Sequence, residues 1–357
     1  MILKILAFLR HERRYLLLFG GLCLAYAFLS MRAESASHRL SVSESPRYQA
    51  FKVAEKQLQA EVGTQEQLRQ LMDRKPVVTA LFIGYTAVFA ALFFGGLLLW
   101  SLLLLPSFRE QYWRTYPLEA KHWPLSLLLR VIVHFLGLSL FMNLALSGLV
   151  LLFPQLNTNA MALIHTGIMD AAAAFIILLE LGISKKSILS FGFDLKGRSV
   201  WGEMLFGLGG YMTVVPFFAL ILFALVFLAQ KFSYEPEPHP LVDVFLSQEK
   251  RDQWMIFFSI FLACVWGPFF EEVFFRGLCY PVFKGVFGTV PAGLLSAGFF
   301  ALIHRNEFAF LPIFLLGIGL VWLYERRGNL VAPITLHIFH NCLFIGYFFT
   351  AKALMGG

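Results

Sequence analysis

Charged residues are scarce in this chain of 357 residues, since Asp, Glu, Lys and Arg together account for only 14%. Hydrophobic residues account for 58%, and the mean hydropathy of +0.70 lies outside the range expected for a soluble globular protein. This shortage of charge excludes a soluble enzyme and indicates a polytopic membrane protein of the all-α class. The net charge of +7 is not gathered into a dense basic patch, so the sequence predicts contact with the lipid bilayer and no nucleic-acid partner.

Cysteine is also rare, and its placement excludes two kinds of site. No pair of cysteines has the C-x-x-C spacing, and none lies in the long polar segment of the chain. The four cysteines are scattered through apolar runs: Cys23, Cys264, Cys279 and Cys342. Neither a disulfide framework nor a cysteine-based zinc site is therefore predicted.

Long apolar runs dominate the sequence instead, and we interpret nine of them as transmembrane helices. They cover residues 15–31, 77–106, 125–153, 159–184, 202–230, 254–283, 288–305, 308–325 and 330–351. Basic residues between positions 4 and 14 precede the first run, which therefore resembles a signal anchor with a cytoplasmic N-terminus. A cleaved signal peptide is the alternative, because Ala25-Tyr26-Ala27 has the small-x-small form, and cleavage would leave eight spans.

The only long polar segment covers residues 32–76. Apolar residues such as Phe51, Ala54 and Leu58 recur there at helical spacing, so we expect two short amphipathic helices that lie on the outer leaflet, cap the bundle, touch a partner or form a packed hairpin. The predicted organisation has four parts: an anchor (1–31), an extramembrane helical segment (32–76), accessory transmembrane helices (77–200) and a C-terminal core (201–357).

Some residues in the spans are expected to hold helices together. Arg130 lies in one span and Asp170 in the next, and we predict a buried ion pair between them that fixes helix packing. Five glycines are predicted to be positions where helices pack closely: Gly207, Gly209, Gly210, Gly317 and Gly319.

Three short polar patterns interrupt the last apolar runs. In order, they are Glu271-Glu272-x-x-x-Arg276, Phe300-x-x-x-His304 and His337-x-x-x-Asn341. Ionisable residues inside a bilayer are costly, so the default interpretation is a functional site that faces the protein interior. At about 1.5 Å per helical residue, the three patterns lie at compatible depths and can meet near mid-membrane.

The two glutamates are predicted to have different roles, because neighbouring helical positions point about 100 degrees apart. Glu272 lies four residues before Arg276, the favourable order for an acid–base pair on a helix, so we assign this pair to holding the helix. Glu271 is then the base that takes a proton from water. The Gly267-Pro268 step just before it should loosen or break the helix and free a backbone carbonyl.

The remaining polar residues complete a hydrolytic set. His304 would orient the water or protonate the leaving amine, and His337 and Asn341 would donate hydrogen bonds to the oxyanion of a tetrahedral intermediate. A base, a proton donor and an oxyanion hole suit direct hydrolysis of an amide without an activated serine or cysteine. We favour a reaction without a cofactor. Zinc held by His304, His337, His340 and a glutamate is the less favoured alternative, and a packing role is expected for His340.

The three patterns and their surroundings resemble the CAAX protease and bacteriocin-processing family of intramembrane glutamic-type endopeptidases. The resemblance covers about residues 200–350, including Tyr324-Glu-Arg-Arg-Gly-Asn-Leu between the second and third patterns. It implies that Glu271 activates water, that Glu272 and Arg276 support it, and that His304, His337 and Asn341 are the other catalytic positions.

The resemblance also implies a substrate and a location. The substrate would be a membrane-associated or lipidated protein or peptide, and the chain would be a multi-pass protein of a prokaryotic cytoplasmic membrane. A non-catalytic scaffold or bacteriocin-immunity protein that binds a peptide or lipid in the same cavity is the alternative. It explains the residue set less well, because a binding cavity would not need all four of the catalytic positions.

Overall fold

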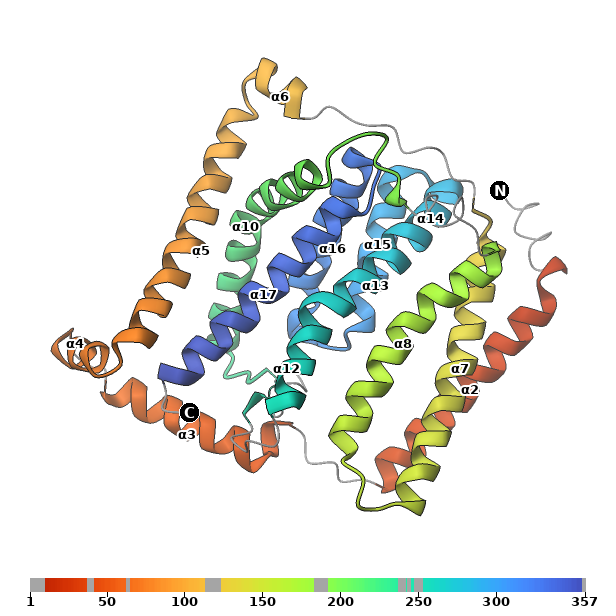
Figure 1. Cartoon of the computed structure of the whole chain (residues 1–357), viewed down its shortest axis with the longest axis horizontal. Coiled ribbons are helices and arrows are strands. Elements are labelled where there is room, and N and C mark those ends of the chain that lie inside the picture. The colour runs from red at the N-terminus through yellow and green to blue at the C-terminus, as the bar shows by residue number, and fades with distance from the viewer. Residues whose placement is uncertain are drawn as a thin grey trace.

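The protein is a bundle of α-helices in a computed structural model (Figure 1), and no strand occurs in the part of the chain that the model describes. The described residues are 10–36, 42–61, 65–112, 123–182, 192–236, 242, 245–246 and 253–354. The predicted all-α class is confirmed. The apolar helices identify an integral membrane protein, as the composition indicated.

Seven helical segments among the described residues are long and apolar enough to cross a membrane. They are α5 (Pro76–Leu102), α7 (Leu125–Leu152), α8 (Thr158–Leu181), α10 (Val200–Lys231), the composite helix Gln253–Phe287, α16 (Glu307–Arg327) and α17 (Val331–Leu354). The first predicted span forms α2 (Arg13–Ala36), which is not among the seven. The run predicted at 288–305 forms α15 (Thr289–Ile303), whose 15 residues rise only about 22 Å, less than a bilayer core.

The polar segment forms the two short helices predicted for it, α3 (Pro46–Glu61) and α4 (Gln65–Arg74). The ring of Phe51 on α3 stacks against that of Phe348 on α17, with centroids 6.1 Å apart. The Lys75 ammonium, just after α4, donates a hydrogen bond of 2.9 Å to the carbonyl of Ala353. Of the arrangements that the sequence left open, these contacts agree with the one in which the two short helices cap the bundle. Both helices lie near the C-terminal end of α17 (Figure 1). Residues 37–41 and 62–64 of the segment lie outside the described residues.

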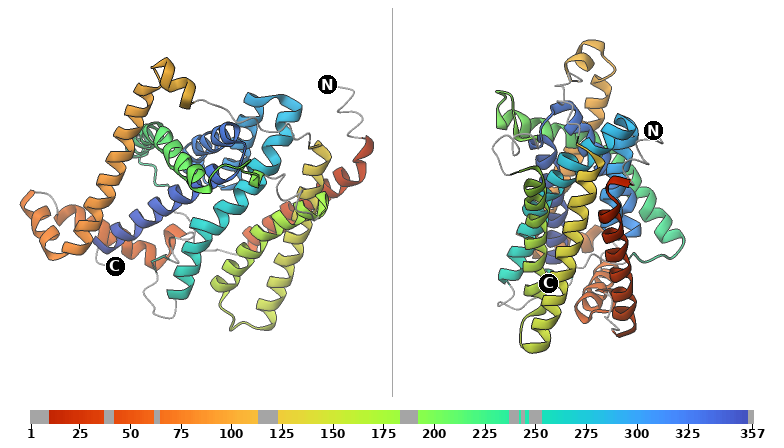
Figure 2. Two further views of the ribbon diagram at one scale, coloured as in Figure 1. Left: turned by 45° about the horizontal axis from the view of Figure 1, so that its top comes forward. Right: turned by 90° about the vertical axis from the view of Figure 1, so that its right-hand side faces the viewer.

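The composite helix Gln253–Phe287 lies between two groups of helices (Figures 1 and 2). On one side, α8 packs against it, α7 packs against α8, and α2 packs against α7. On the other side, α10, α15, α16 and α17 pack against one another, and α5 covers α10 and α17. An apolar core is formed mainly where α10, α15, α16 and α17 meet the composite helix. The predicted domain boundaries stay predictions.

Arg130 does not pair with Asp170, so that prediction is wrong. The Arg130 guanidinium lies 2.8 Å from the carboxylate of Glu12, which precedes α2 and is 2% exposed. His134, one turn further along α7, lies 3.0 Å from Glu180 on α8. The spacing of residues along neighbouring helices does not tell which faces meet, and Glu12 precedes the run from which the first span was predicted.

Four of the five glycines are positions of close helix packing, as predicted: Gly207, Gly210, Gly317 and Gly319. A Cβ atom at Gly207 would lie 2.5 Å from the carbonyl oxygen of Ala332, where α10 crosses α17. Gly209 differs, because nothing lies within 4 Å of its Cβ position. The prediction is wrong for Gly209, which faces away from the crossing.

Alanine at these two glycines should therefore act in opposite ways. Gly207→Ala should lower the free energy of unfolding by about 1–3 kcal/mol, since the backbone of α17 has to move. Gly209→Ala should leave stability unchanged or raise it slightly, because it adds helix propensity and contacts nothing. Thermal unfolding of the two variants in the same detergent measures the difference, and equal unfolding temperatures would contradict the close crossing of α10 and α17.

Candidate active site

The composite helix changes geometry twice around the two glutamates. It consists of α12 (Gln253–Phe261), the π-helical turn η4 (Leu262–Trp266), α13 (Gly267–Phe274), the π-helical turn η5 (Phe275–Cys279) and α14 (Tyr280–Phe287). Pro268 has no N–H to donate, so the preceding turn lacks one of its hydrogen bonds. The predicted loosening at Gly267-Pro268 thus takes the form of a wide turn, and the helix continues through it. Such π-turns are frequent at functional sites.

Asn341 of α17 contacts this wide turn. Its side-chain amide donates a hydrogen bond of 2.7 Å to the carbonyl oxygen of Ala263, which lies within η4. The amide N–H therefore fastens α17 to the turn that precedes Glu271. The role of Asn341 as a donor to an oxyanion stays a prediction.

Glu272 and Arg276 form an ion pair that is completely buried, with both side chains 0% exposed. The Arg276 guanidinium donates a hydrogen bond of 2.8 Å to Glu272 Oε1 and one of 3.2 Å to the carbonyl of Gly317 on α16. It also lies over the ring of Phe300, 4.6 Å from the ring centroid, in cation–π geometry. The pair predicted from the i,i+4 spacing is therefore present, and it ties α13 to α15 and α16.

His337 lies between the two glutamates. Its Nδ1 donates a hydrogen bond of 2.9 Å to Glu272 Oε1, and its Nε2 lies 3.6 Å from Glu271 Oε2. The contact at Nδ1 sets the orientation of the ring, as a hydrogen bond to one imidazole nitrogen generally does for the other. Glu272 thus aims His337 at Glu271, a contact that the sequence did not indicate.

Glu271 is the more accessible of the two carboxylates, with 29% of its side chain exposed where Glu272 has none. It belongs to α13, which packs against α8 on one side and α17 on the other. Glu271 is therefore the carboxylate that a molecule outside the protein interior can reach.

His304 joins this cluster through Phe300. It follows the last residue of α15, and its Nδ1 donates a hydrogen bond of 2.7 Å to the Phe300 carbonyl. The Phe300 ring is fully buried and makes edge-to-face contacts with both His304 and His337, at centroid distances of 4.8 and 5.5 Å. The sequence analysis assigned no role to Phe300. In the structure its ring contacts Arg276, His304 and His337.

His340 faces away from the glutamates. It forms a hydrogen bond of 3.2 Å with the hydroxyl of Tyr211 on α10, and its ring packs against Phe344 and Phe218. This is the packing contact expected for it. Across the described ranges, no group of three or more His, Cys, Asp or Glu side chains is arranged to hold a metal ion.

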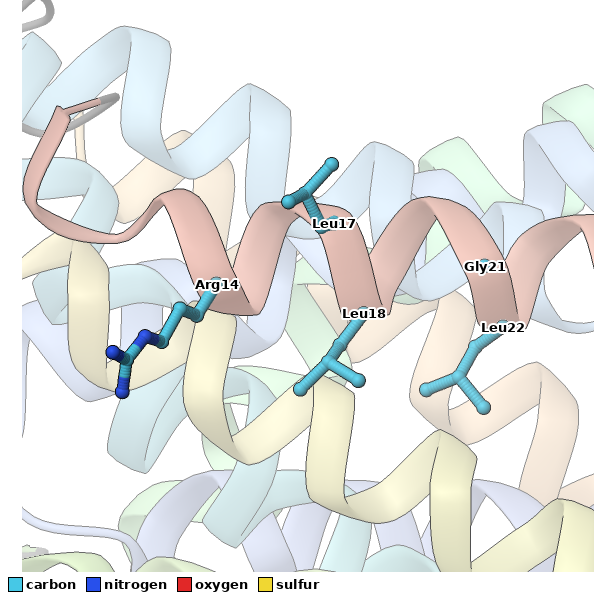
Figure 3. Close-up of a pocket in the computed structure, with 5 residues that line it drawn as sticks. All are labelled: Arg14, Leu17, Leu18, Gly21 and Leu22. Atoms are coloured by element: carbon cyan, nitrogen blue, oxygen red, sulfur yellow. The ribbon is translucent and has the colours of Figure 1, made fainter.

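A surface hollow on α2 is separate from this cluster (Figure 3). It is lined by Arg14, Leu17, Leu18, Gly21 and Leu22, which all belong to one helix. Since α2 packs against α7 and α7 packs against α8, two helices lie between this hollow and the helix that carries the glutamates.

Loss of the Glu272 charge should affect folding more than loss of the Glu271 charge. Glu272→Gln leaves Arg276 as an uncompensated buried charge, which should cost about 3–5 kcal/mol of the free energy of unfolding. Glu271→Gln removes no short ion pair and should leave stability within about 1 kcal/mol. Thermal unfolding in detergent, with Glu307→Gln at an exposed position as control, compares the variants. A Glu272→Gln protein as stable as the wild type would contradict this account of the pair.

Comparison with known proteins bears on the same segment. Residues 253–343 match a family model that is described as type II CAAX prenyl endopeptidase Rce1-like. No curated protein and no solved structure matches the chain. The matched segment contains Glu271, Glu272, Arg276, His304, His337 and Asn341. The comparison confirms the resemblance that the sequence motifs indicated, because this segment is similar to the Rce1-like family of CAAX prenyl endopeptidases.

Proposed function

We propose that the protein is an intramembrane endopeptidase that hydrolyses a peptide bond of a membrane-associated or lipidated protein or peptide, using water activated by Glu271. One observation carries this proposal. The two adjacent carboxylates have different surroundings. Glu272 is buried against Arg276 and His337, whereas Glu271 is partly exposed beside the same histidine. The family match of residues 253–343 supports the reaction class.

The reaction needs a base, support for the oxyanion and a proton for the leaving amine. Glu271 takes a proton from water, and the resulting hydroxide adds to the carbonyl carbon of the scissile bond. His337, held at Nδ1 by Glu272, presents Nε2 on the side of Glu271, and in its imidazolium form it would donate the Nε2 proton to the oxyanion. When the C–N bond breaks, the leaving amine takes a proton from His304, and the proton held by Glu271 then passes to His304, so that both groups return to their starting protonation.

The chemistry of the substrate follows from the family description and the depth of the site. The description of the matched family names a prenyl endopeptidase. A prenyl chain on the substrate would partition into the bilayer beside apolar helices. We extend the proposal to a substrate with a lipid group close to the scissile bond, because such a group would hold that bond at the depth of Glu271.

Replacing the proposed base should abolish cleavage without unfolding the protein. Glu271→Gln and His304→Ala should each reduce the rate by about 10²-fold or more, the usual contribution of general acid–base catalysis. Membrane peptides from cells that express the wild type, Glu271→Gln or Glu307→Gln would be compared by mass spectrometry. Product peptides should appear with the wild type and the Glu307→Gln control and be absent with Glu271→Gln, which also reveals the cleavage site.

The alternative of a scaffold or bacteriocin-immunity protein has a different outcome. If cells with correctly inserted Glu271→Gln and His304→Ala proteins keep the full biological activity, the residues are not used for cleavage and the scaffold is favoured.

Chelation tests the metal-free mechanism. Cleavage by the detergent-solubilised protein should continue in excess EDTA or 1,10-phenanthroline, because Glu271 activates water directly. Loss of cleavage that is restored by added zinc would replace this mechanism by one in which a metal activates the water.

A further inference from the structure

The surface hollow on α2 combines a cation with an apolar wall. Its lining runs from Arg14 past Leu17, Leu18 and Gly21 to Leu22 (Figure 3). Its volume of about 480 Å³ lies within the range of about 300–1,000 Å³ that is typical of ligand sites. Leu17 is 67% exposed and Leu18 is 55% exposed, so the described part of the chain leaves this wall largely uncovered.

The hollow runs along the flank of α2, beside the face that packs on α7. That face carries Tyr15, whose ring makes an edge-to-face contact with His134, and Tyr26, whose hydroxyl donates a hydrogen bond of 3.3 Å to the Leu136 carbonyl. Arg14 is the neighbour of Tyr15, and consecutive helical positions point about 100 degrees apart. The packing of α2 against α7 therefore leaves the hollow open.

The two ends of the hollow lie at different depths in the bilayer. Glu12, just before α2, pairs with Arg130, which is only five residues after Leu125 at the start of α7. Because the 28 residues of α7 rise about 42 Å and a bilayer core is about 30 Å thick, Arg14 lies near the level of the lipid headgroups. Leu22 is eight residues further along α2, about 12 Å toward the acyl chains.

The charge of Arg14 is available for an anion. Glu12 is the neighbouring acidic residue, but it is 2% exposed and is held by Arg130. The Arg14 side chain is exposed and forms no hydrogen bond or ion pair with a described residue. Arg10 and Arg13 are exposed as well. This end of α2 therefore presents positive charge to the membrane surface, where anionic lipid headgroups are attracted to basic residues.

We propose that the hollow binds an anionic phospholipid, with the phosphate on the Arg14 guanidinium and one acyl chain along the wall from Leu17 to Leu22. A guanidinium matches a phosphate with two parallel hydrogen bonds. Gly21 has no side chain and leaves the space in which the acyl chain lies. The inference concerns a helix outside the matched segment and does not depend on the proposed function.

Filling the hollow should weaken lipid binding. A Cβ at Gly21 or at Gly20 meets nothing within 4 Å, so leucine at either position fits without displacing a neighbour, and only Gly21 lines the hollow. Gly21→Leu should weaken binding of the first phosphatidylglycerol by about tenfold, since about two methylene groups lose their apolar contact. Gly20→Leu should bind like the wild type. Native mass spectrometry of the detergent-solubilised protein, titrated with phosphatidylglycerol, measures these affinities.

The headgroup contact has its own pair of variants. Arg14→Gln should weaken binding of phosphatidylglycerol by about fivefold and leave that of phosphatidylcholine unchanged, because one basic residue near the surface is lost. Arg13→Gln removes an exposed arginine that does not line the hollow, and it should have a clearly smaller effect.

Two results would overturn the proposal. Equal losses in Arg13→Gln and Arg14→Gln would mean that only the diffuse charge at this end of α2 attracts lipid. Unchanged lipid binding in Gly21→Leu would show that no acyl chain occupies the hollow. If the same variant also lost a dimer seen in the wild-type mass spectrum, the hollow would be a contact between two copies of the chain.

Discussion

The site depends on one interaction, the buried ion pair between Glu272 and Arg276. Removing two charges from water is costly, and such a pair is tolerated only when further hydrogen bonds satisfy both partners. Here the Gly317 carbonyl and the Phe300 ring contact the guanidinium, and His337 contacts the carboxylate, while Glu272 Oε2 and Arg276 Nε have no hydrogen-bond partner among the described residues. These partners come from α16, α15 and α17. One ion pair on the composite helix therefore contacts three neighbouring helices beside the more exposed Glu271.

The separation of two adjacent glutamates is a consequence of helix geometry. Side chains at consecutive positions point about 100 degrees apart, so one can face the core while the next faces the edge of the bundle. The buried member holds the histidine, and the other member keeps 29% of its side chain exposed. His337 connects them, since its two nitrogens contact different carboxylates. A change at Glu272 would therefore disturb the partner of Glu271 as well as the helix.

The sequence predicted what depends on a single helix, whereas its predictions of contacts between helices were right for four of the five glycines and wrong for one ion pair. The i,i+4 spacing was enough for Glu272 and Arg276, and the composition was enough for the all-α membrane bundle. The pair of Arg130 and Asp170 failed, as did the close packing of Gly209, because contacts across helices depend on how each helix is rotated about its axis. A helix that is apolar on every face has no single apolar stripe, so its sequence says little about how it is rotated. The contact of His337 with both glutamates was missed for the same reason.

Helices outside the matched segment build part of the site's surroundings. Tyr211 of α10 holds His340, three residues after His337, and α8 lies against the turn that precedes Glu271 through Gly167 and Trp266. At its other end, α17 is capped by α3 through Phe51 and Phe348. The helix that carries His337 is therefore held at both ends by elements outside its own packing with α13. The matched segment carries the polar cluster, and the flanking helices α8, α10 and α3 contact the elements that hold it.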